Sequence, residues 1–395
     1  MTKKVLILGS GASGSIVANK LSRELRNEIA RDEVEIKILD KDNTNINQAG
    51  FTFLPFGLYA VEDIMRSRNR LISPRINSVF GENGEVTRIN IEEREVKVKS
   101  GETYDYDYLL ISTGCTADMS EIQSTEFNTF YTSIDDALKI GNLIRDFDKG
   151  DIAILTLRMP IPCPGAPSKF TVLLEEYLRY VRNVRKNINI KFLWPVESIG
   201  PPAYNSLICK ILEERDVTVM KKFTTSKIDS KKKQIISDSG EKVKYDLLIG
   251  IPPHKCIDAL ITSDITDESG WIPVDKYTLQ YRKSNKEKYD EVYAIGDTGP
   301  AEILKTGIGA HYQALITAQN LINDILGNET KVRYMGETGC PFINSLYTSF
   351  KKGEAYIPMW TYNKPLEPFN TTKMGWLMYR MYYYIYWDTA IKALI

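Results

Sequence analysis

The sequence lacks an excess of charge of either sign, because 51 lysine and arginine residues are matched by 51 aspartate and glutamate residues. A protein that binds nucleic acid needs a basic surface, so this balance argues against that class. The chain also has no apolar run of the roughly 18 to 20 residues that a membrane-spanning helix needs. Its 395 residues, 43% of them hydrophobic, have the composition of a folded protein of two or three domains.

Histidine and cysteine are scarce as well. The only histidines are His254 and His311, and the five cysteines are not clustered with them at metal-ligand spacing, so we expect no metal site. The first residues do not show the charged and apolar pattern of a secretory signal. We therefore expect a protein of a reducing compartment, in which disulfides are usually catalytic rather than structural.

The first 40 residues carry the pattern of a dinucleotide-binding unit. An apolar run at residues 5–8 is followed by a glycine-rich turn, a helical pattern to about residue 25 and a second strand at 34–39 that ends in an acid. The glycines permit a tight turn, approach of the backbone to a pyrophosphate and close helix packing, and the acid accepts hydrogen bonds from a ribose. The predicted binding residues are Gly9, Gly11, Ala12, Ser13, Gly14 and Asp40.

Two later strand ends indicate which dinucleotide is bound. One strand, within residues 104–114, ends in Thr113-Gly114, and another, within 289–297, ends in Gly296-Asp297. They resemble motifs of the pyridine-nucleotide disulfide oxidoreductases and related flavoproteins, in which the aspartate bonds the ribityl chain of the flavin. The resemblance implies an FAD-binding domain made of residues 1–114 and 286–330.

A second dinucleotide domain is expected at residues 115–285, but its fingerprint is degenerate. After a strand at 152–157 the chain has prolines at 160, 162, 164 and 167 in place of a glycine turn. Proline has no N–H to offer a pyrophosphate, so we predict that a nicotinamide dinucleotide site has been lost. The predicted fold class is thus α/β, with two tandem Rossmann-like domains and a C-terminal region at 331–395.

Three of the five cysteines are expected at loops that face one cofactor. Cys115 follows the Thr-Gly motif, Cys163 lies in the proline-rich loop, and Cys340 lies beyond the segment that closes the FAD domain. Cys209 and Cys256 are interpreted as small hydrophobic residues.

Over essentially its whole length the chain resembles the sulfide:quinone oxidoreductases. The segments that carry the resemblance are Cys163-Pro164-Gly165-Ala166-Pro167-Ser168-Lys169, residues 48–57, 245–254 and 270–279, and Lys305-Thr306-Gly307 with residues 311–314. The resemblance implies that Cys163 and Cys340 form a redox pair which sulfide attacks. The released thiolate, Cys340 by analogy, then passes two electrons through FAD to a membrane quinone.

The resemblance also implies further site residues. Lys305, Thr306 and Gly307 are expected at the cofactor, and Lys169 is a candidate for the cation that favours a thiolate. Cys115 matches a third cysteine of the family that is covalently linked to FAD in some members, and the resemblance implies that it takes part in catalysis with Cys163 and Cys340. A spare thiol beside the ring is the alternative. Phe342 and Trp376 are expected on the quinone side.

The C-terminal segment has a two-sided helical pattern. Met374, Leu377, Met378, Met381 and Ile385 share one face, and Trp376, Tyr379, Tyr383, Tyr386 and Trp387 gather on the other. Aromatic side chains with a polar atom favour the membrane–water boundary, so we expect this segment to lie on a lipid bilayer. A dimer contact or a lid over the core is the alternative.

We therefore expect a peripheral enzyme of the cell membrane, on its cytoplasmic side, with hydrogen sulfide, a quinone and the bilayer surface as partners. The sequence is also compatible with a homo-oligomer. Three alternatives remain open: a type II NADH:quinone oxidoreductase, a sulfide dehydrogenase that reduces a cytochrome, and a flavin-binding subunit without turnover. The proline-rich loop argues against the first, the aromatic tail against the second, and the cysteines against the third.

Overall fold

The apolar run at the start of the chain forms β1 (Lys3–Leu8), which lies inside a six-stranded sheet and pairs in parallel with β2 and β9. A computed structural model describes all residues except 123, 285–286, 301, 346–353 and 364–371. The sheet has the order β19-β20-β9-β1-β2-β5. Its other strands are β2 (Val34–Asp40), β5 (Asn77–Phe80), β9 (Tyr108–Ile111), β19 (Gln280–Arg282) and β20 (Lys288–Ala294).

Helices and a small sheet cover the two faces of this first sheet. On one face α1 (Ala12–Glu24), followed by α2 (Arg26–Ala30), packs with α8 (Gly307–Leu326) in one hydrophobic cluster. The other face packs on an antiparallel sheet of β6 (Val86–Asn90), β7 (Glu95–Val98) and β8 (Thr103–Asp105), with α7 (Asp258–Ile261) beside it. Burial on both faces explains why β1 reads as a continuous apolar run.

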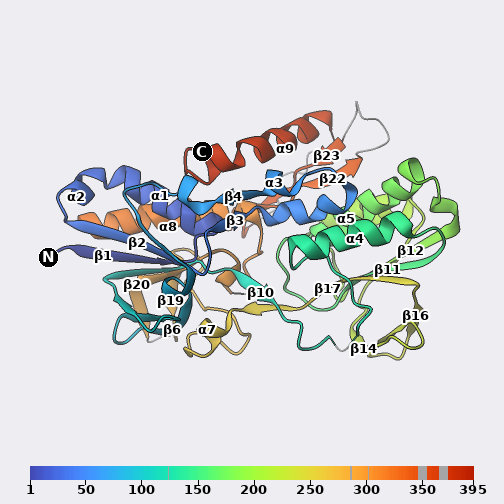
Figure 1. The fold of residues 1–395 in the computed structure, drawn as a ribbon, viewed down its shortest axis with the longest axis horizontal. Helices are drawn as coiled ribbons and strands as arrows, with labels where there is room; N and C mark the ends of the chain where they lie inside the picture. Colours follow the sequence, from blue (N-terminus) through green and yellow to red (C-terminus); the bar gives the residue numbers. More distant parts are fainter. Residues whose placement is uncertain (123, 285–286, 301, 346–353, 364–371) are drawn as a thin grey trace.

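The second sheet lies at the other end of the molecule (Figure 1) and is parallel, with the order β13-β12-β11-β17. Its strands are β11 (Gly150–Thr156), β12 (Ile188–Leu193), β13 (Val217–Met220) and β17 (Leu247–Ile251). The helices of its main core are α4 (Ile134–Asp146), α5 (Ala166–Glu176) and α6 (Pro202–Glu213). An antiparallel sheet covers its other side: β14 (Thr225–Asp229), β15 (Gln234–Ser237) and β16 (Lys242–Lys244).

An antiparallel ribbon of β10 (Cys115–Ala117) and β18 (His254–Cys256) carries the chain from the first sheet to the second and back. The expected boundary at residue 286 lies outside the described residues. The structure shows that β19, which begins at Gln280, already pairs with β20 in the first sheet.

The C-terminal region bridges the two sheets along one side of the molecule (Figure 1). It holds β21 (Thr338–Gly339), β22 (Phe342–Ser345), β23 (Glu354–Tyr356), β24 (Met359–Trp360) and α9 (Lys373–Ile385). Beneath α9 lie α3 (Val61–Ile64), β3 (Thr44–Ile46), β4 (Met65–Ser67) and short 3-10 turns at Gln48–Thr52 and Leu54–Phe56. Within the described ranges, no helix combines the length and apolar character required to cross a membrane.

Candidate functional site

The glycine turn after β1 has the geometry that its spacing predicts. Gly9 has a φ of +90°, and a Cβ added there would lie 2.5 Å from the Ser112 carbonyl oxygen. A Cβ at Gly14 would overlap the carbonyl of Gly9, whereas no described atom lies within 4 Å of a Cβ added at Gly11. The first and third glycines thus allow close packing, and the second leaves the N-terminus of α1 accessible to a phosphate.

Asp40 lies at the end of β2, beside this turn. One carboxylate oxygen accepts a hydrogen bond from Ser10 N at 2.6 Å, and the other pairs with Arg68 Nη1 at 2.5 Å. Each carboxylate oxygen has a second lone pair, so both contacts leave acceptor capacity for a ribose. Arg68 could not be predicted from the sequence, because no local pattern links it to Asp40.

The two strand-end motifs meet at the same edge of the first sheet. Gly114 N donates to Thr298 Oγ1 at 3.0 Å, which joins the end of β9 to the end of β20. Thr113 Oγ1 is buried without a hydrogen-bond partner, and in the described part of the chain the Asp297 carboxylate forms neither a hydrogen bond nor an ion pair. Burial raises the pKa of Asp297. These unpaired polar atoms fit a hydroxyl-rich ligand such as the ribityl chain of FAD.

Lys305 is a buried residue rather than a solvated one. Its ammonium donates to the carbonyl oxygens of Asp297 at 3.0 Å and Gly299 at 2.7 Å, and lies 3.6 Å from the centre of the Trp271 ring. Desolvation lowers the pKa of Lys305, while the negative charge of Asp297 raises it. Lys305 therefore holds the loop that carries Asp297 in place.

The N-terminus of α8 also points at this site. The Thr306 side chain caps the helix by accepting from Gly309 N at 2.9 Å, and it lies 2.5 Å from Thr338 Oγ1. No described atom lies within 4 Å of a Cβ added at Gly307. The partial positive charge of this helix end is thus directed at an accessible position.

Cys163 and Cys340 are brought into contact although 177 positions separate them in the sequence. Their sulfur atoms lie 3.5 Å apart, and both are free thiols in this structure. Cys163 N donates to the Lys305 carbonyl oxygen at 2.5 Å, and its φ of +46° is uncommon for a residue other than glycine. The Tyr131 hydroxyl holds the same loop by donating to the carbonyls of Pro162 and Cys163 at 2.8 and 3.0 Å.

The two thiols are not equivalent electrostatically. The pKa of Cys340 is lowered to about 6, chiefly by a hydrogen bond from Cys163 and further by the charge of Lys169 and the N–H of Gly165. The pKa of Cys163 is raised well above its ordinary value, because this thiol donates that hydrogen bond and is buried. Cys340 is therefore the thiolate of the pair.

Lys169, one turn into α5, carries a positive charge that lowers the pKa of both thiols. Its side chain is buried, with a relative exposure of 4% for the residue. The ammonium lies 6.0 Å from the centre of the Phe53 ring and 5.9 Å from that of Tyr379 in α9. It forms no ion pair with a carboxylate in the described part of the chain, so its charge acts on the two cysteines.

Cys115 lies on the ribbon between the sheets, where it is paired across β10 and β18 with Cys256. Burial raises the pKa of Cys115 well above its ordinary value, and the charge of Asp297 adds to this effect. It is thus a weak nucleophile. Cys209 lies apart in α6, with its thiol 3.7 Å from Asn205 Oδ1.

The two residues expected on the quinone side occupy different environments. Phe342 is fully buried in β22, with its ring 6.2 Å from and perpendicular to that of Tyr204. Trp376 is half-buried in α9 and stacks on Tyr379 with a centroid distance of 6.3 Å. Tyr204 was not identified from the sequence, since its only local signal is its position in the first turn of α6.

The orientation of α9 differs from our expectation. We expected its aromatic side chains at a membrane boundary, but Tyr379, Tyr383 and Trp387 are buried against the first 70 residues of the chain. Tyr383 stacks on Tyr59 with a centroid distance of 3.8 Å. The apolar face defined by Met374, Leu377, Met378 and Met381, joined by Tyr384, is exposed instead. The aromatic face of α9 therefore packs on the protein, and its apolar face of methionine and leucine is exposed.

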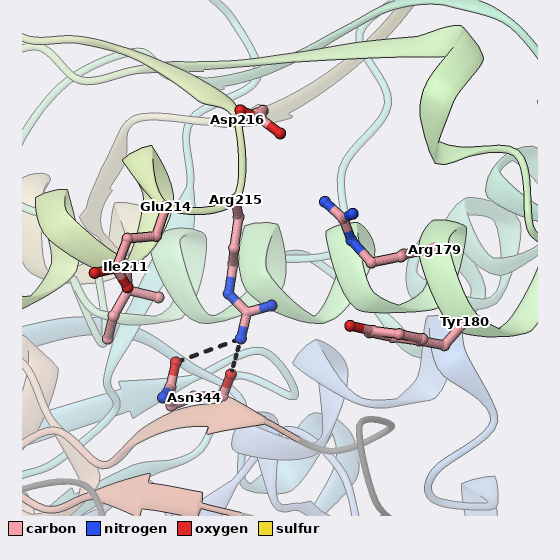
Figure 2. Close-up of a pocket in the computed structure, with 7 residues that line it drawn as sticks. All are labelled: Arg179, Tyr180, Ile211, Glu214, Arg215, Asp216 and Asn344. Carbon is pink, nitrogen blue, oxygen red and sulfur yellow. Dashed lines mark hydrogen bonds between the residues drawn. The ribbon is translucent and has the colours of Figure 1, made fainter.

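A pocket of about 360 Å³ lies between the turn that follows α5, the C-terminal end of α6 and β22. Figure 2 shows its lining, in which Arg215 donates to Asn344 O at 2.6 Å. Arg179 and Arg215 face this pocket, but both also contact Glu175, at 2.5 and 3.0 Å. Because both guanidinium groups already pair with Glu175, and Glu214 and Asp216 also line the pocket, we assign the pocket no ligand.

The chain is similar in sequence to several known proteins. Residues 3–148 match the family model of the pyridine nucleotide-disulphide oxidoreductases. The chain is 29% identical over 385 residues to the mitochondrial sulfide:quinone oxidoreductase of Dictyostelium discoideum, covering 90% of this chain and 82% of that protein. It is 27% identical over 415 residues to the mitochondrial sulfide:quinone oxidoreductase of Mus musculus, covering 99% and 86%.

The fold is also that of a solved relative. The structure of the sulfide:quinone oxidoreductase from Aquifex aeolicus matches with a TM-score of 0.82 at 18% identity, covering 99% of this chain and 92% of that one. The α/β fold class predicted from the sequence is confirmed, and so is the resemblance that its motifs indicated.

Proposed function

We propose that this chain, a homologue of the sulfide:quinone oxidoreductases, oxidises sulfide to polysulfide or sulfur and transfers the electrons to a quinone. The observation that carries the proposal is the contact between the sulfur atoms of Cys163 and Cys340, 3.5 Å apart, beside the two strand-end motifs. Neither the NADH:quinone nor the cytochrome alternative is favoured by an observation on this chain.

FAD is the cofactor that the site supports best. The glycine turn and Asp40 would hold its adenosine and pyrophosphate, Thr113 and Asp297 would bond the ribityl chain, and the N-terminus of α8 would face the ring. When bound, FAD accepts an electron pair from sulfur and passes it to a quinone. Because burial raises the pKa of Cys115, we favour contact of this thiol with FAD over a covalent link.

In the oxidised enzyme Cys163 and Cys340 would form a disulfide. Hydrosulfide attacks Cys163 Sγ, the bond between the two cysteines breaks, and the products are a persulfide on Cys163 and a thiolate on Cys340. The incoming sulfur is oxidised and the disulfide is reduced, so the step needs no other oxidant. Lys169 and the N–H of Gly165 stabilise the Cys340 thiolate, which makes it the better leaving group.

The domain division remains a proposal, with a second Rossmann-like domain whose nucleotide site is lost. The N-terminus of α5, where a nicotinamide dinucleotide would bind its pyrophosphate, begins with Ala166-Pro167 and faces the cysteines. We propose that the first turn of α5 therefore stabilises the cysteine thiolate instead of binding a pyrophosphate.

We also propose that the exposed face of α9 lies on a lipid bilayer and that Trp376 lines the quinone side, with Phe342 packed behind the cysteine pair. Met374, Leu377, Met378 and Met381 present an exposed apolar surface on one helix face. Arg380 borders this surface and donates to the Tyr384 hydroxyl at 2.7 Å. Peripheral binding on the cytoplasmic side and homo-oligomer formation remain predictions.

The test is anaerobic reduction of the purified flavoprotein, followed by the visible flavin band. Sulfide should bleach the band and a quinone should restore it, whereas bleaching by NADH alone would contradict the proposal. Cys163→Ser and Cys340→Ser should each lose sulfide-dependent bleaching while FAD stays bound. Cys209→Ser is the matched control and should behave as the wild type, because Cys209 lies apart in α6.

A further inference from the structure

The hydroxyl of Tyr204 is a buried polar group at the cysteine site that has no role in the chemistry described so far. Tyr204 lies in the first turn of α6 with a relative exposure of 3%. Its hydroxyl forms no hydrogen bond of ordinary geometry with any residue that the structure describes. A buried hydroxyl without a partner is costly, so its presence at a reactive site calls for a functional explanation.

The hydroxyl lies directly beside Cys340. A Cβ added at Gly165 would overlap both Tyr204 Oη and Cys340 Sγ, so these two atoms share the space in front of that glycine. The Tyr204 hydroxyl also contributes to lowering the pKa of Cys340. The other polar neighbour, Ser168, has its hydroxyl proton directed to the Gly165 carbonyl oxygen at 3.0 Å.

Packing fixes the direction of the Tyr204 ring. The rings of Phe342, Tyr356 and Trp360 surround it at centroid distances of 6.2, 6.4 and 6.3 Å. All three belong to the same C-terminal region as Cys340. The hydroxyl and the sulfur are therefore held together by one aromatic cluster, and no competing hydrogen bond turns the hydroxyl away.

The hydroxyl has a proton to donate throughout the neutral pH range. Burial raises the pKa of Tyr204 well above its ordinary value, and the neighbouring cysteines raise it further. A neutral disulfide sulfur is a weak acceptor, whereas a thiolate is a strong one. The hydroxyl is thus an available donor whose interaction with Cys340 strengthens when that sulfur carries a negative charge.

We propose that Tyr204 is a catalytic residue that donates a hydrogen bond to the Cys340 thiolate released when sulfide attacks Cys163. This inference deepens the proposed function and rests on it. In that step the bond between the two cysteine sulfurs breaks, the electron pair stays on Cys340, and Tyr204 keeps its proton. The interaction is made by the product thiolate and not by the disulfide, so it favours the reaction and fixes which cysteine receives the persulfide.

The decisive variant is Tyr204→Phe, which removes the hydroxyl and keeps the ring in its cluster. Ultraviolet absorbance of the thiolate in the reduced holoenzyme, measured against pH and corrected with Cys340→Ser, reports the pKa of Cys340. Loss of one hydrogen bond to a charged sulfur should raise this pKa by about one to two units. Tyr356→Phe is the matched control and should leave it unchanged, since Tyr356 packs on the Tyr204 ring but does not contribute to the pKa of Cys340.

A second substitution at position 204 should shift the pKa of Cys340 in the opposite direction. A fluorinated tyrosine at position 204 is a stronger donor with nearly the same shape, so it should lower the pKa of Cys340. In the Tyr204→Phe variant the acid limb of sulfide-dependent flavin reduction should move to higher pH by the same amount as the thiolate titration. An equal loss of rate at every pH would indicate a structural role and overturn the proposal.

The thiolate titration needs neither sulfide nor quinone, so it separates this inference from the proposed function. An unchanged pKa in Tyr204→Phe refutes the hydrogen bond even when sulfide reduces the flavin. A raised pKa in a protein that sulfide does not reduce supports the hydrogen bond and refutes the sulfide chemistry.

Discussion

At the scale of single residues, the cysteine pair depends on the buried positive charge of Lys169 and on the close approach of two sulfurs. The ammonium of Lys169 lies about 6 Å from the rings of Phe53 and Tyr379, and its charge acts on both cysteines. A buried ammonium is stable only when a negative charge or a ring face is near it. The negative charge available here is a cysteine thiolate, which explains why Lys169 and the lowered pKa of Cys340 occur together.

Replacement of Lys169 by methionine tests this dependence. The variant Lys169→Met keeps the volume and removes the charge, so the pKa of Cys340 should rise from about 6 by about one unit. Cys340 is a thiolate above its pKa. When that pKa rises, the variant should therefore become protonated, and lose activity, at a higher pH than the wild type. The measurement is the pH dependence of flavin reduction by sulfide.

The control for this prediction is Lys210→Met, which removes an exposed lysine from α6. It should keep the wild-type pH profile. A Lys169→Met profile that coincides with the wild type would show that the lysine does not act on the cysteines.

At the scale of elements, α5 connects the sulfur site to the rest of the molecule. Its N-terminus faces the cysteines, and near its C-terminus Glu175, which is fully buried, pairs with Arg179 and Arg215. Arg215 also donates to the Asn344 carbonyl in β22 at 2.6 Å (Figure 2). The strand that follows Cys340 is thus tied to α5 through a buried ion pair.

Glu175→Gln should therefore destabilise the fold. The change removes the carboxylate that Arg179, Arg185 and Arg215 share. Because Arg179 is partly exposed and Arg215 keeps its contact with Glu176, the cost should be about 1 to 3 kcal/mol, less than for a fully buried pair. Urea unfolding should show this as a lower midpoint. Glu214→Gln, at an exposed position of the same pocket, should change the free energy of unfolding by less than about 0.5 kcal/mol. Equal effects of the two variants would contradict the assignment.

The proposed docking of the exposed α9 face on a bilayer can be tested by adding charge to that face. The double variant Leu377→Glu and Met381→Glu places two charges on side chains that are 59% and 57% exposed. Sedimentation with vesicles of anionic lipid should fall several-fold, because charge is costly at an apolar membrane interface. The circular dichroism spectrum should not change, since the buried aromatic face holds the helix.

The matched control adds a charge at an exposed apolar residue outside α9. Val181→Glu changes another exposed apolar residue, 47% exposed after α5, and should leave vesicle binding unaltered. Unchanged sedimentation of the α9 double variant would refute bilayer docking through this face.

At the scale of the whole molecule, the residues that we propose for FAD binding come from distant parts of the chain. The glycine turn, the Thr-Gly motif and Asp297 all lie at one edge of the first sheet, because the carboxyl ends of its parallel strands point the same way. A ligand held by all three stabilises the folded state as a whole.

FAD should therefore raise the melting temperature of the apoprotein. Linkage predicts about 2.7 kcal/mol when free FAD is at 100 times its dissociation constant. Asp297→Ala should reduce this gain, as measured by thermal melts with and without FAD. Asp290→Ala, on β20 just before the turn that holds Asp297 but exposed, is the control and should keep the full gain. An equal gain in both variants would show that Asp297 does not hold the cofactor.

The sequence by itself determined the features that depend on local spacing. Glycines at 9, 11 and 14 impose their turn wherever they follow a strand, and prolines in the loop before α5 remove backbone donors in any context. The α/β class could be predicted for the same reason, since apolar runs of strand length are buried on both faces. The helical spacing of residues 374–387 also predicted which side chains of α9 share a face, although not which face is buried.

The tertiary structure alone decided the features that depend on distant partners. Only folding brings Cys163 within 3.5 Å of Cys340 and places Tyr204 beside them. The orientation of α9 was decided by Tyr59 and Phe53, which offer ring partners to its aromatic face. The pKa of a thiol follows from burial and from nearby charges, and both are properties of the folded chain rather than of sequence spacing.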